Sequence, residues 1–281
     1  MKVSEIRELQ DVLPKYDYTA KLSRDRWAWE FYRRDPEFYE IAQYYHQRDF
    51  ISSIQGARRL TLLKLRRPQP EAEACGLAFF PNPDASALRA NVFWSANTYP
   101  RDICVQIVPT APGVVDEMLI QAMKHCEIIH FTGVDGAEQF LLRRDSCTVQ
   151  VGCEGMSLLS HEPHRMRIVL DGHEDMDEKL AILKSAQRLM AGKADPVPPF
   201  TDRSGDLRNA LICLDAKVAG LSFWEMAEII YGTDHVRSNK NRGSRSLKDA
   251  MRRSLKLGEQ LRDGGFRSLL MPKSCKQELA A

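Results

Sequence analysis

The C-terminal third of the chain carries the most regular apolar pattern, and that pattern constrains the fold most. A leucine or valine recurs at every third or fourth position from residue 207 to residue 218, which predicts an amphipathic helix ended by Gly220. Ser222 and Glu225 have the spacing of a capping box, in which each side chain satisfies a backbone amide at the start of a helix. We therefore predict a second, shorter helix that ends at Gly232.

A third helix is predicted between Ser246 and the sequence Asp263-Gly264-Gly265, with Ser246 and Asp249 as an N-cap signature. Its apolar positions share one face of the helix. They are Leu247, Ala250, Met251, Ser254, Leu255, Gly258 and Leu261. A narrow stripe on a different face is basic. Its members are Lys248, Arg252 and Lys256, with Arg245 preceding them in line.

Basic residues concentrate in and just before this third helix. Between residues 237 and 256 there are eight of them and a single acid, Asp249. The eight are Arg237, Lys240, Arg242, Arg245, Lys248, Arg252, Arg253 and Lys256. Three helices with a basic third helix are typical of a helix-turn-helix domain that binds double-stranded DNA. The stretch from Gly232 to Ser246 is longer than the standard turn, so we predict a wing-like loop or a disordered basic arm there.

The predicted DNA contacts divide into two kinds. Arg245 and Ser246, at the start of the third helix, are expected to meet base edges. Phosphates are expected to contact Arg252, Arg253 and Lys256. The loop residues are expected to contact the flanking DNA backbone or the minor groove, and they are Arg237, Lys240 and Arg242. A plain three-helix bundle with a solvated basic face would show the same pattern, and that alternative stays open.

Residues 1–70 are predicted to be mostly helical, because Ser23 can cap a helix that runs until Pro36. Aromatic residues are dense between residues 27 and 45, which favours a small helical core. A protein-docking surface is the alternative, since aromatic and arginine side chains also anchor interfaces. The residues of that alternative are Trp27, Trp29, Phe31, Arg33 and Arg34.

Short apolar or alternating runs then replace the helical pattern, separated by turn signals such as Pro81-Asn82-Pro83-Asp84. Residues 76–80 and 92–94 are two of these runs, and together they predict strands in a mostly antiparallel arrangement. Two helices are predicted among them, at residues 115–124 and 177–190. We therefore predict an α+β protein with three parts: a helical unit at 1–70, a small strand-rich middle at 71–195 and a three-helix variant helix-turn-helix at 196–281.

The sequence argues against an enzyme, a bound cofactor and a metal centre. The 281 residues contain no phosphate-binding loop, nucleophile elbow or zinc-binding helix motif. Five residues could meet at a metal only if strands brought them together, and buried thiols and ordinary histidines explain them better: His125, Cys126, His130, Cys147 and Cys153. No window reaches the roughly 18 uncharged apolar residues of a membrane span. Seven cysteines without a CxxC pair indicate reduced thiols, so we expect a cytoplasmic protein.

Two stretches resemble known bacterial families. The sequence Arg26-Trp27-Ala28-Trp29-Glu30-Phe31-Tyr32-Arg33-Arg34-Asp35-Pro36-Glu37-Phe38 resembles the signature of a transcriptional-regulator-like N-terminal domain of many alphaproteobacterial proteins. Residues 166–270 resemble the variant helix-turn-helix domain of unknown function that often accompanies it. This second resemblance is carried by Leu214-Asp215-Ala216, Ala219-Gly220-Leu221-Ser222-Phe223, Glu225-Met226-Ala227-Glu228-Ile229, Tyr231-Gly232 and Asp263-Gly264-Gly265-Phe266-Arg267-Ser268-Leu269-Leu270.

This pair of domains occurs in activators of the excision and transfer of integrative and conjugative elements, such as the symbiosis islands of rhizobia. The resemblance implies a sequence-specific transcription activator that binds promoter DNA and a short antiactivator with the same C-terminal domain. RNA polymerase is a further partner expected of an activator. The alternative function is a protein-interaction module that sequesters a partner regulator without binding DNA. In that alternative the basic face pairs with an acidic protein, or with residues 71–200, which hold 11 basic and 18 acidic residues.

Overall fold

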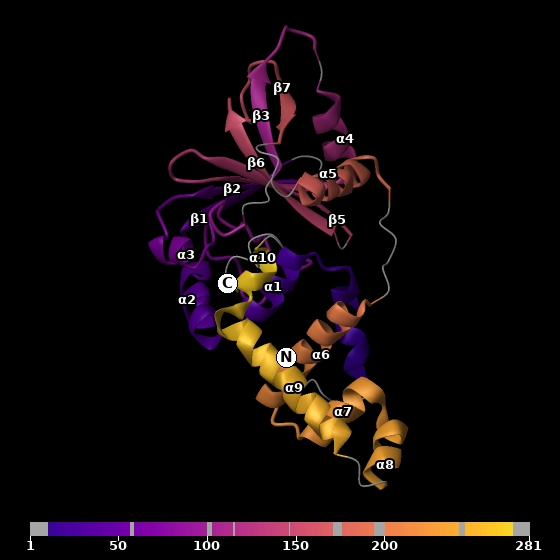
Figure 1. The fold of residues 1–281 in the computed structure, drawn as a ribbon. Coiled ribbons are helices and arrows are strands. Elements are labelled where there is room, and N and C mark those ends of the chain that lie inside the picture. The colour runs from indigo at the N-terminus through magenta and orange to yellow at the C-terminus, as the bar shows by residue number, and fades with distance from the viewer. Residues whose placement is uncertain are drawn as a thin grey trace, which may run out of the picture. The chain divides into compact units, whose positions relative to one another are not determined.

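The computed structural model describes residues 11–56, 59–99, 103–114, 116–145, 147–170, 176–193, 200–241 and 245–271 (Figure 1). The chain forms two compact units, each built from separate stretches of sequence. The helical unit contains residues 1–36 and 197–269, and the sheet unit contains residues 37–196 and 270–281. The predicted domains 1–70, 71–195 and 196–281 stay a prediction, because compactness alone does not show which stretch folds independently.

In the helical unit, the N-terminal residues form the 3₁₀ helix η3 (Leu13–Lys21) and helix α1 (Arg24–Tyr32). The C-terminal residues form α6 (Asp202–Val218), α7 (Phe223–Tyr231), α8 (Thr233–Asn241), α9 (Ser246–Gln260), the π-helical segment η4 (Leu261–Gly265) and α10 (Arg267–Leu270). The predicted capping box starts α7, because Ser222 N donates to Glu225 Oε2 at 2.7 Å and Ser222 Oγ accepts from Glu225 N. Within the described residues, none of the helices has the length and apolarity that a bilayer span requires.

One apolar core holds these helices together. Helix α6 contributes Leu211 and Leu214, helix α9 contributes Met251, and all three side chains are buried. Tyr32 of α1 stacks on Phe266, which follows η4, with ring centroids 4.1 Å apart. The N-terminal helices therefore share a core with the C-terminal ones, although about 170 residues separate them in the sequence.

Helix α2 (Pro36–His46) leads into the sheet unit. In the described residues, seven strands form one sheet in the order β1-β2-β4-β5-β6-β3-β7. They are β1 (Ile51–Gln55), β2 (Leu60–Leu65), β3 (Ile103–Pro109), β4 (Glu127–Thr132), β5 (Glu138–Arg144), β6 (Cys147–Gly155) and β7 (His164–Val169). Strand β2 is parallel to β4 and β3 is parallel to β6, whereas the other neighbours are antiparallel. This mixed sheet, with helices before and after it, confirms the predicted α+β class.

Two layers cover the sheet. Helices α4 (Glu117–His125) and α5 (Met176–Met190) lie side by side and share an apolar cluster with side chains such as Ile128 and Phe140 (Figure 1). The neighbouring residue Ile129 belongs to a different cluster, with Phe79 and Phe93 from the irregular segment that follows α3 (Pro70–Ala74). Because successive side chains of a strand point to opposite faces, α4 and α5 cover one face and this segment covers the other.

Residues 51–65 differ from the helical prediction, because they form β1 and β2. Thr61, Leu63 and Leu65 are buried at alternate positions, and β2 pairs with a strand on each side. The runs 76–80 and 92–94, expected as strands, meet only in an isolated bridge between Leu77 and Trp94. A side chain takes the place of a strand partner there. The Gln150 side chain accepts from Trp94 N at 3.0 Å and donates to Trp94 O at 2.8 Å.

Candidate nucleic-acid interface

Helix α9 is fixed to the core by its apolar face. Leu247, Met251 and Leu255 are buried at the spacing of helical turns. Gly258 lies so close to α6 that a Cβ there would be 2.7 Å from Leu214 Cγ and 2.8 Å from the Ala210 carbonyl oxygen. The predicted apolar face is therefore the face that packs on α6, and the opposite face of α9 is directed away from the core.

The opposite face of α9 carries exposed cations. Arg252, Arg253 and Lys256 are exposed, Arg245 is exposed immediately before the helix, and Lys248 is half-buried at the edge of the apolar face. From Arg245 to Lys256 the stripe extends over about 17 Å of helix axis, at about 1.5 Å per residue. The structure thus brings these predicted site residues together on one helix.

Arg252 makes two contacts inside the protein. Its Nη1 donates to Asp249 Oδ1 at 2.9 Å, and its Cζ lies 5.7 Å from the ring centre of Phe223 in α7. Both side chains of the ion pair are about half exposed, at 56% and 48%. Exposed pairs of this kind contribute about 0–1 kcal/mol, so a phosphate can replace Asp249 at small cost.

The start of α9 differs from the prediction by one residue. Arg245, not Ser246, is the N-cap, because the Arg245 carbonyl accepts the first helical hydrogen bond, from Asp249 N at 3.1 Å. Ser246 is the first residue of the helix and is exposed. Arg245 makes no capping hydrogen bond, and its guanidinium, which has only N–H donors, cannot accept from the backbone amides of the first turn.

Residues 233–241, expected within a wing or a disordered arm, form helix α8 instead. Only Gly232, with φ of +85°, separates α8 from α7. Val236 is the single aliphatic residue in the sequence of α8, and it is buried. The sequence of this helix therefore has no apolar period that would predict it. Arg237 is exposed on α8 and Lys240 belongs to the same helix. Arg242 lies outside the described residues.

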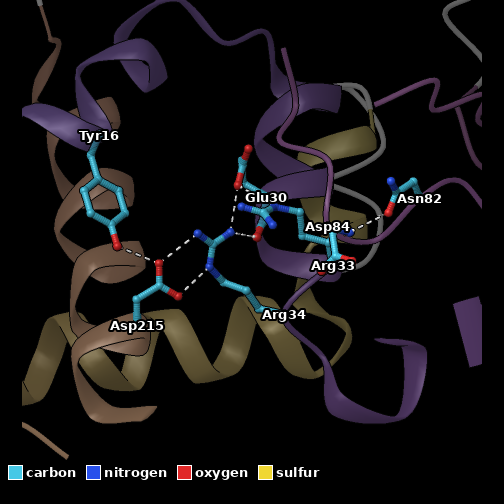
Figure 2. Close-up of polar contacts among 7 residues, drawn as sticks. All are labelled: Tyr16, Glu30, Arg33, Arg34, Asn82, Asp84 and Asp215. Atoms are coloured by element: carbon cyan, nitrogen blue, oxygen red, sulfur yellow. Dashed lines mark hydrogen bonds and ion pairs between the residues drawn. The ribbon is translucent and has the colours of Figure 1, made fainter. Parts of the chain in front are cut away.

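A buried ionic cluster joins the N-terminal residues to α6 (Figure 2). Asp215 of α6 accepts hydrogen bonds from Tyr16 Oη at 2.6 Å and from Arg34 Nε and Nη2 at 2.7 and 2.8 Å. Arg34 Nη1 also donates to Glu30 Oε2 at 2.7 Å, and Arg33 Nε donates to the same oxygen at 2.8 Å. The Glu30 side chain is completely buried. The core of the helical unit therefore needs the charges of the N-terminal residues to neutralise those of Glu30 and Asp215.

The cluster favours the charged forms of Asp215 and Arg34. Burial alone would raise the pKa of Asp215, but Arg34 and the hydrogen bond from Tyr16 hold that pKa below its usual value. Burial also opposes the charge of Arg34, yet Asp215 and Glu30 raise its pKa well above the usual value. Burial and Asp215 raise the pKa of Tyr16, so its hydroxyl remains a hydrogen-bond donor. At neutral pH Asp215 and Arg34 thus form an ion pair, and the neutral phenol of Tyr16 completes the hydrogen bonds of Asp215.

The structure does not expose the aromatic residues of the predicted docking surface in the N-terminal segment. Trp27, Trp29 and Phe31 are buried, and none of them presents its side chain to a partner. Arg33 and Arg34 are engaged in the ionic cluster. Sequence reasoning assigned no role to Glu30 or Asp215. The signal in the sequence was the spacing of Glu30 and Arg34, which is that of an ion pair on one helical face.

A basic helix seated on a compact helical core is the arrangement by which helix-turn-helix proteins read duplex DNA. Residues 169–271 match the family model described as "T6SS, Transcription factor, DNA binding domain". The matched stretch contains helices α5 to α10 and slightly more than a third of the chain. The match supports a DNA-binding regulator of transcription. No sequence among the curated proteins matches the chain.

Proposed function

We propose that the protein is a sequence-specific regulator that activates transcription and places α9 in the major groove of promoter DNA. The observation that carries this proposal is the exposed cationic face of α9, opposite the face that packs on α6. The family match over residues 169–271 supports DNA binding independently of this geometry.

In the proposed complex the two ends of α9 have different tasks. Arg245 and Ser246, at the N-terminus, reach base edges, while Arg253 and Lys256 bind phosphates. Arg252 gives up its ion pair with Asp249 and binds a phosphate oxygen instead, which costs about 0–1 kcal/mol because the pair is exposed. Arg237 on α8 contacts the flanking backbone. About five phosphate contacts correspond to a slope of about −4 to −5 for the logarithm of affinity against that of salt concentration.

Binding is tested by fluorescence anisotropy at two salt concentrations, with a duplex selected from a random library and with random duplex. We expect Arg252→Ala to weaken binding to both duplexes alike, because a phosphate contact is independent of sequence. Arg245→Ala is expected to cost about 1–3 kcal/mol on the selected duplex and to leave binding to random duplex nearly unchanged. The matched control is Lys217→Ala, an exposed lysine of α6.

Lys217→Ala is expected to change neither affinity by more than about two-fold. Binding that does not depend on salt, or no binding to either duplex at low salt, would contradict the proposal. That outcome would favour the alternative in which the basic face binds an acidic protein.

The target genes are proposed from resemblance and not from geometry. Since the chain resembles activators of excision and transfer, we place its targets at promoters of excision and transfer genes of a mobile element. The description of the matched family names T6SS instead. Chromatin immunoprecipitation with sequencing separates the two. Enrichment beside an excisionase or transfer gene is expected, and enrichment at other promoters would contradict this part of the proposal while leaving DNA binding intact.

A further inference from the structure

The sheet unit contains an open hollow of about 980 Å³ at one end of its sheet. The hollow lies where β2 and β4 begin and where β1 and β5 end, and the lining residues there include Gln55, Thr61, Glu127 and Arg143. Gln55 pairs with Thr61 and Glu127 pairs with Arg143, so these strand ends are direct neighbours. The volume is at the upper end of the range for small-molecule sites.

The described residues that line the hollow carry an excess of three positive charges. The five cations are Arg59, Arg89, Lys124, Arg143 and Arg144. Two carboxylates oppose them. Glu127 Oε2 lies 3.5 Å from Arg143 Nη1, and Asp145 Oδ2 lies 3.7 Å from Arg144 Nε. A concave surface with an excess of one sign of charge concentrates the potential and attracts small ions of the other sign.

Arg143 is held in place by the surrounding structure, and Arg144 follows it in the sequence beside the end of α5. Arg143 is 8% exposed, and its Nη2 donates to Ala90 O at 2.8 Å and to Asn91 Oδ1 at 2.9 Å. Arg144 lies against Gly192 at the end of α5, where a Cβ would be 3.1 Å from Arg144 Nη1. Groups that are already fixed lose little conformational freedom when a ligand binds.

The rim of the hollow also contains unusual backbone. In the described part of the chain, Arg59 with φ of +64° and Asp145 with φ of +52° are the residues other than glycine that have positive φ. Both line the hollow. Backbone in this left-handed region is strained for a residue with a Cβ, and such residues cluster at ligand sites.

The lining identifies the chemistry of the ligand. Among the described lining residues Leu88 is the only aliphatic side chain and the imidazole of His125 is the only aromatic ring, so recognition depends mainly on charge and hydrogen bonds. The volume fits a molecule about 10 Å across. The major groove of duplex DNA is already about 12 Å wide, so a whole duplex is too wide to enter the hollow. We propose that this hollow binds a small molecule that carries two or more linked phosphate groups.

Isothermal titration calorimetry of the full-length protein with inorganic pyrophosphate, in metal-free buffer, tests the proposal. We expect saturable one-to-one binding with Kd below about 1 mM. Arg144→Gln and Lys124→Gln are each expected to weaken binding by at least about ten-fold, because each removes a charge-assisted hydrogen bond. Lys124 is exposed at the end of α4, so its replacement leaves the fold intact.

The matched control is Arg167→Gln, which removes the same charge from an exposed position of β7 outside the hollow. Its affinity for pyrophosphate is expected to stay within about two-fold of the unmodified protein. The proposal is overturned if no saturable binding occurs up to about 10 mM pyrophosphate, or if all three variants lose affinity equally. It is also overturned if Arg144→Gln and Lys124→Gln leave the affinity for pyrophosphate unchanged. Since the titration contains no DNA, its failure leaves the proposed function untouched.

Discussion

Asp215 has a side chain that is 11% exposed, and it accepts hydrogen bonds from Arg34 and Tyr16, which lie 181 and 199 positions away in the sequence. Without this carboxylate, Arg34 would keep Glu30 as its remaining acidic neighbour, and Arg33 already shares Glu30. Removing one partner of a buried ion pair leaves the other charge poorly compensated, at a cost of about 3–5 kcal/mol.

We therefore expect Asp215→Ala to lower the free energy of unfolding by about 3–5 kcal/mol, measured by urea titration with tryptophan fluorescence. The control is Asp206→Ala, an exposed aspartate of the same helix, which should change the free energy by less than about 0.5 kcal/mol. Equal effects of the two substitutions would show that the buried pair contributes no more than an ordinary surface charge.

The same carboxylate makes stability depend on pH. The pKa of Asp215 is lower in the folded protein than in the unfolded chain, because Arg34 and Tyr16 outweigh its burial. Its contribution is thus complete above the unfolded value of about 3.9 and is lost as the pH falls through the folded value. The stability difference between the unmodified protein and Asp215→Asn should shrink as the pH is lowered from about 5 to about 3. Urea titrations across this range measure it, and a constant difference would argue against the ion pair.

At the scale of elements, the packing of α6 on α9 depends on Gly258. An alanine Cβ there would meet the Ala210 carbonyl oxygen at 2.8 Å, and a backbone atom cannot move aside as a side-chain end can. We expect Gly258→Ala to destabilise the protein by about 1–3 kcal/mol, although alanine favours a helix by about 1 kcal/mol. Gly205→Ala in α6 is the control, since no atom lies within 4 Å of its Cβ position. Thermal unfolding compares the two, and Gly205→Ala should be neutral or stabilising.

Helices with a strong apolar period or a side-chain cap could be predicted from the sequence, and the others could not. Leu211 and Leu214 mark α6, and Ser222 marks the start of α7. Helix α8 has only one aliphatic residue, Val236, so its sequence shows no apolar period from which a helix could be predicted. The leucine-rich run of β2 has little intrinsic preference for a strand, and its pairing with β4, more than 60 residues later, decides its conformation.

The cationic face of α9 was predictable for the same reason as the helix itself. The helical period of about 3.6 residues that assigns Leu255 to the apolar face also assigns Lys256 to the exposed face. The ionic cluster was not, since Tyr16 and Asp215 meet only after the chain has folded. The hollow in the sheet unit depends on strand order, which brings Arg59 and Arg144 to one sheet end from distant segments. Spacing along a single helix is thus readable in the sequence, and proximity between segments is not.

At the scale of the whole molecule, the helical unit is discontinuous. Its helices α6 to α9 fall inside the stretch that matches the DNA-binding family model, whereas η3 and α1 fall outside it. Yet Arg34 and Tyr16 donate hydrogen bonds to Asp215, and Arg34 also binds Glu30. Tyr32 stacks on Phe266. The N-terminal residues are therefore part of the platform that positions α9, although they belong to a different region of the sequence.

Deleting residues 1–36 should consequently remove the cooperative thermal unfolding of the helical unit and lower duplex affinity with it. The transition of the sheet unit should remain, because the described residues of the two clusters that pack on its sheet all follow residue 50. Differential scanning calorimetry and anisotropy follow the two effects, and adding a peptide of residues 11–36 should restore both, since the Asp215 contacts are non-covalent. A deletion variant that keeps both its transitions and its DNA affinity would mean that α6 to α9 form a complete DNA-binding unit, and that the buried charge of Asp215 is compensated by water instead.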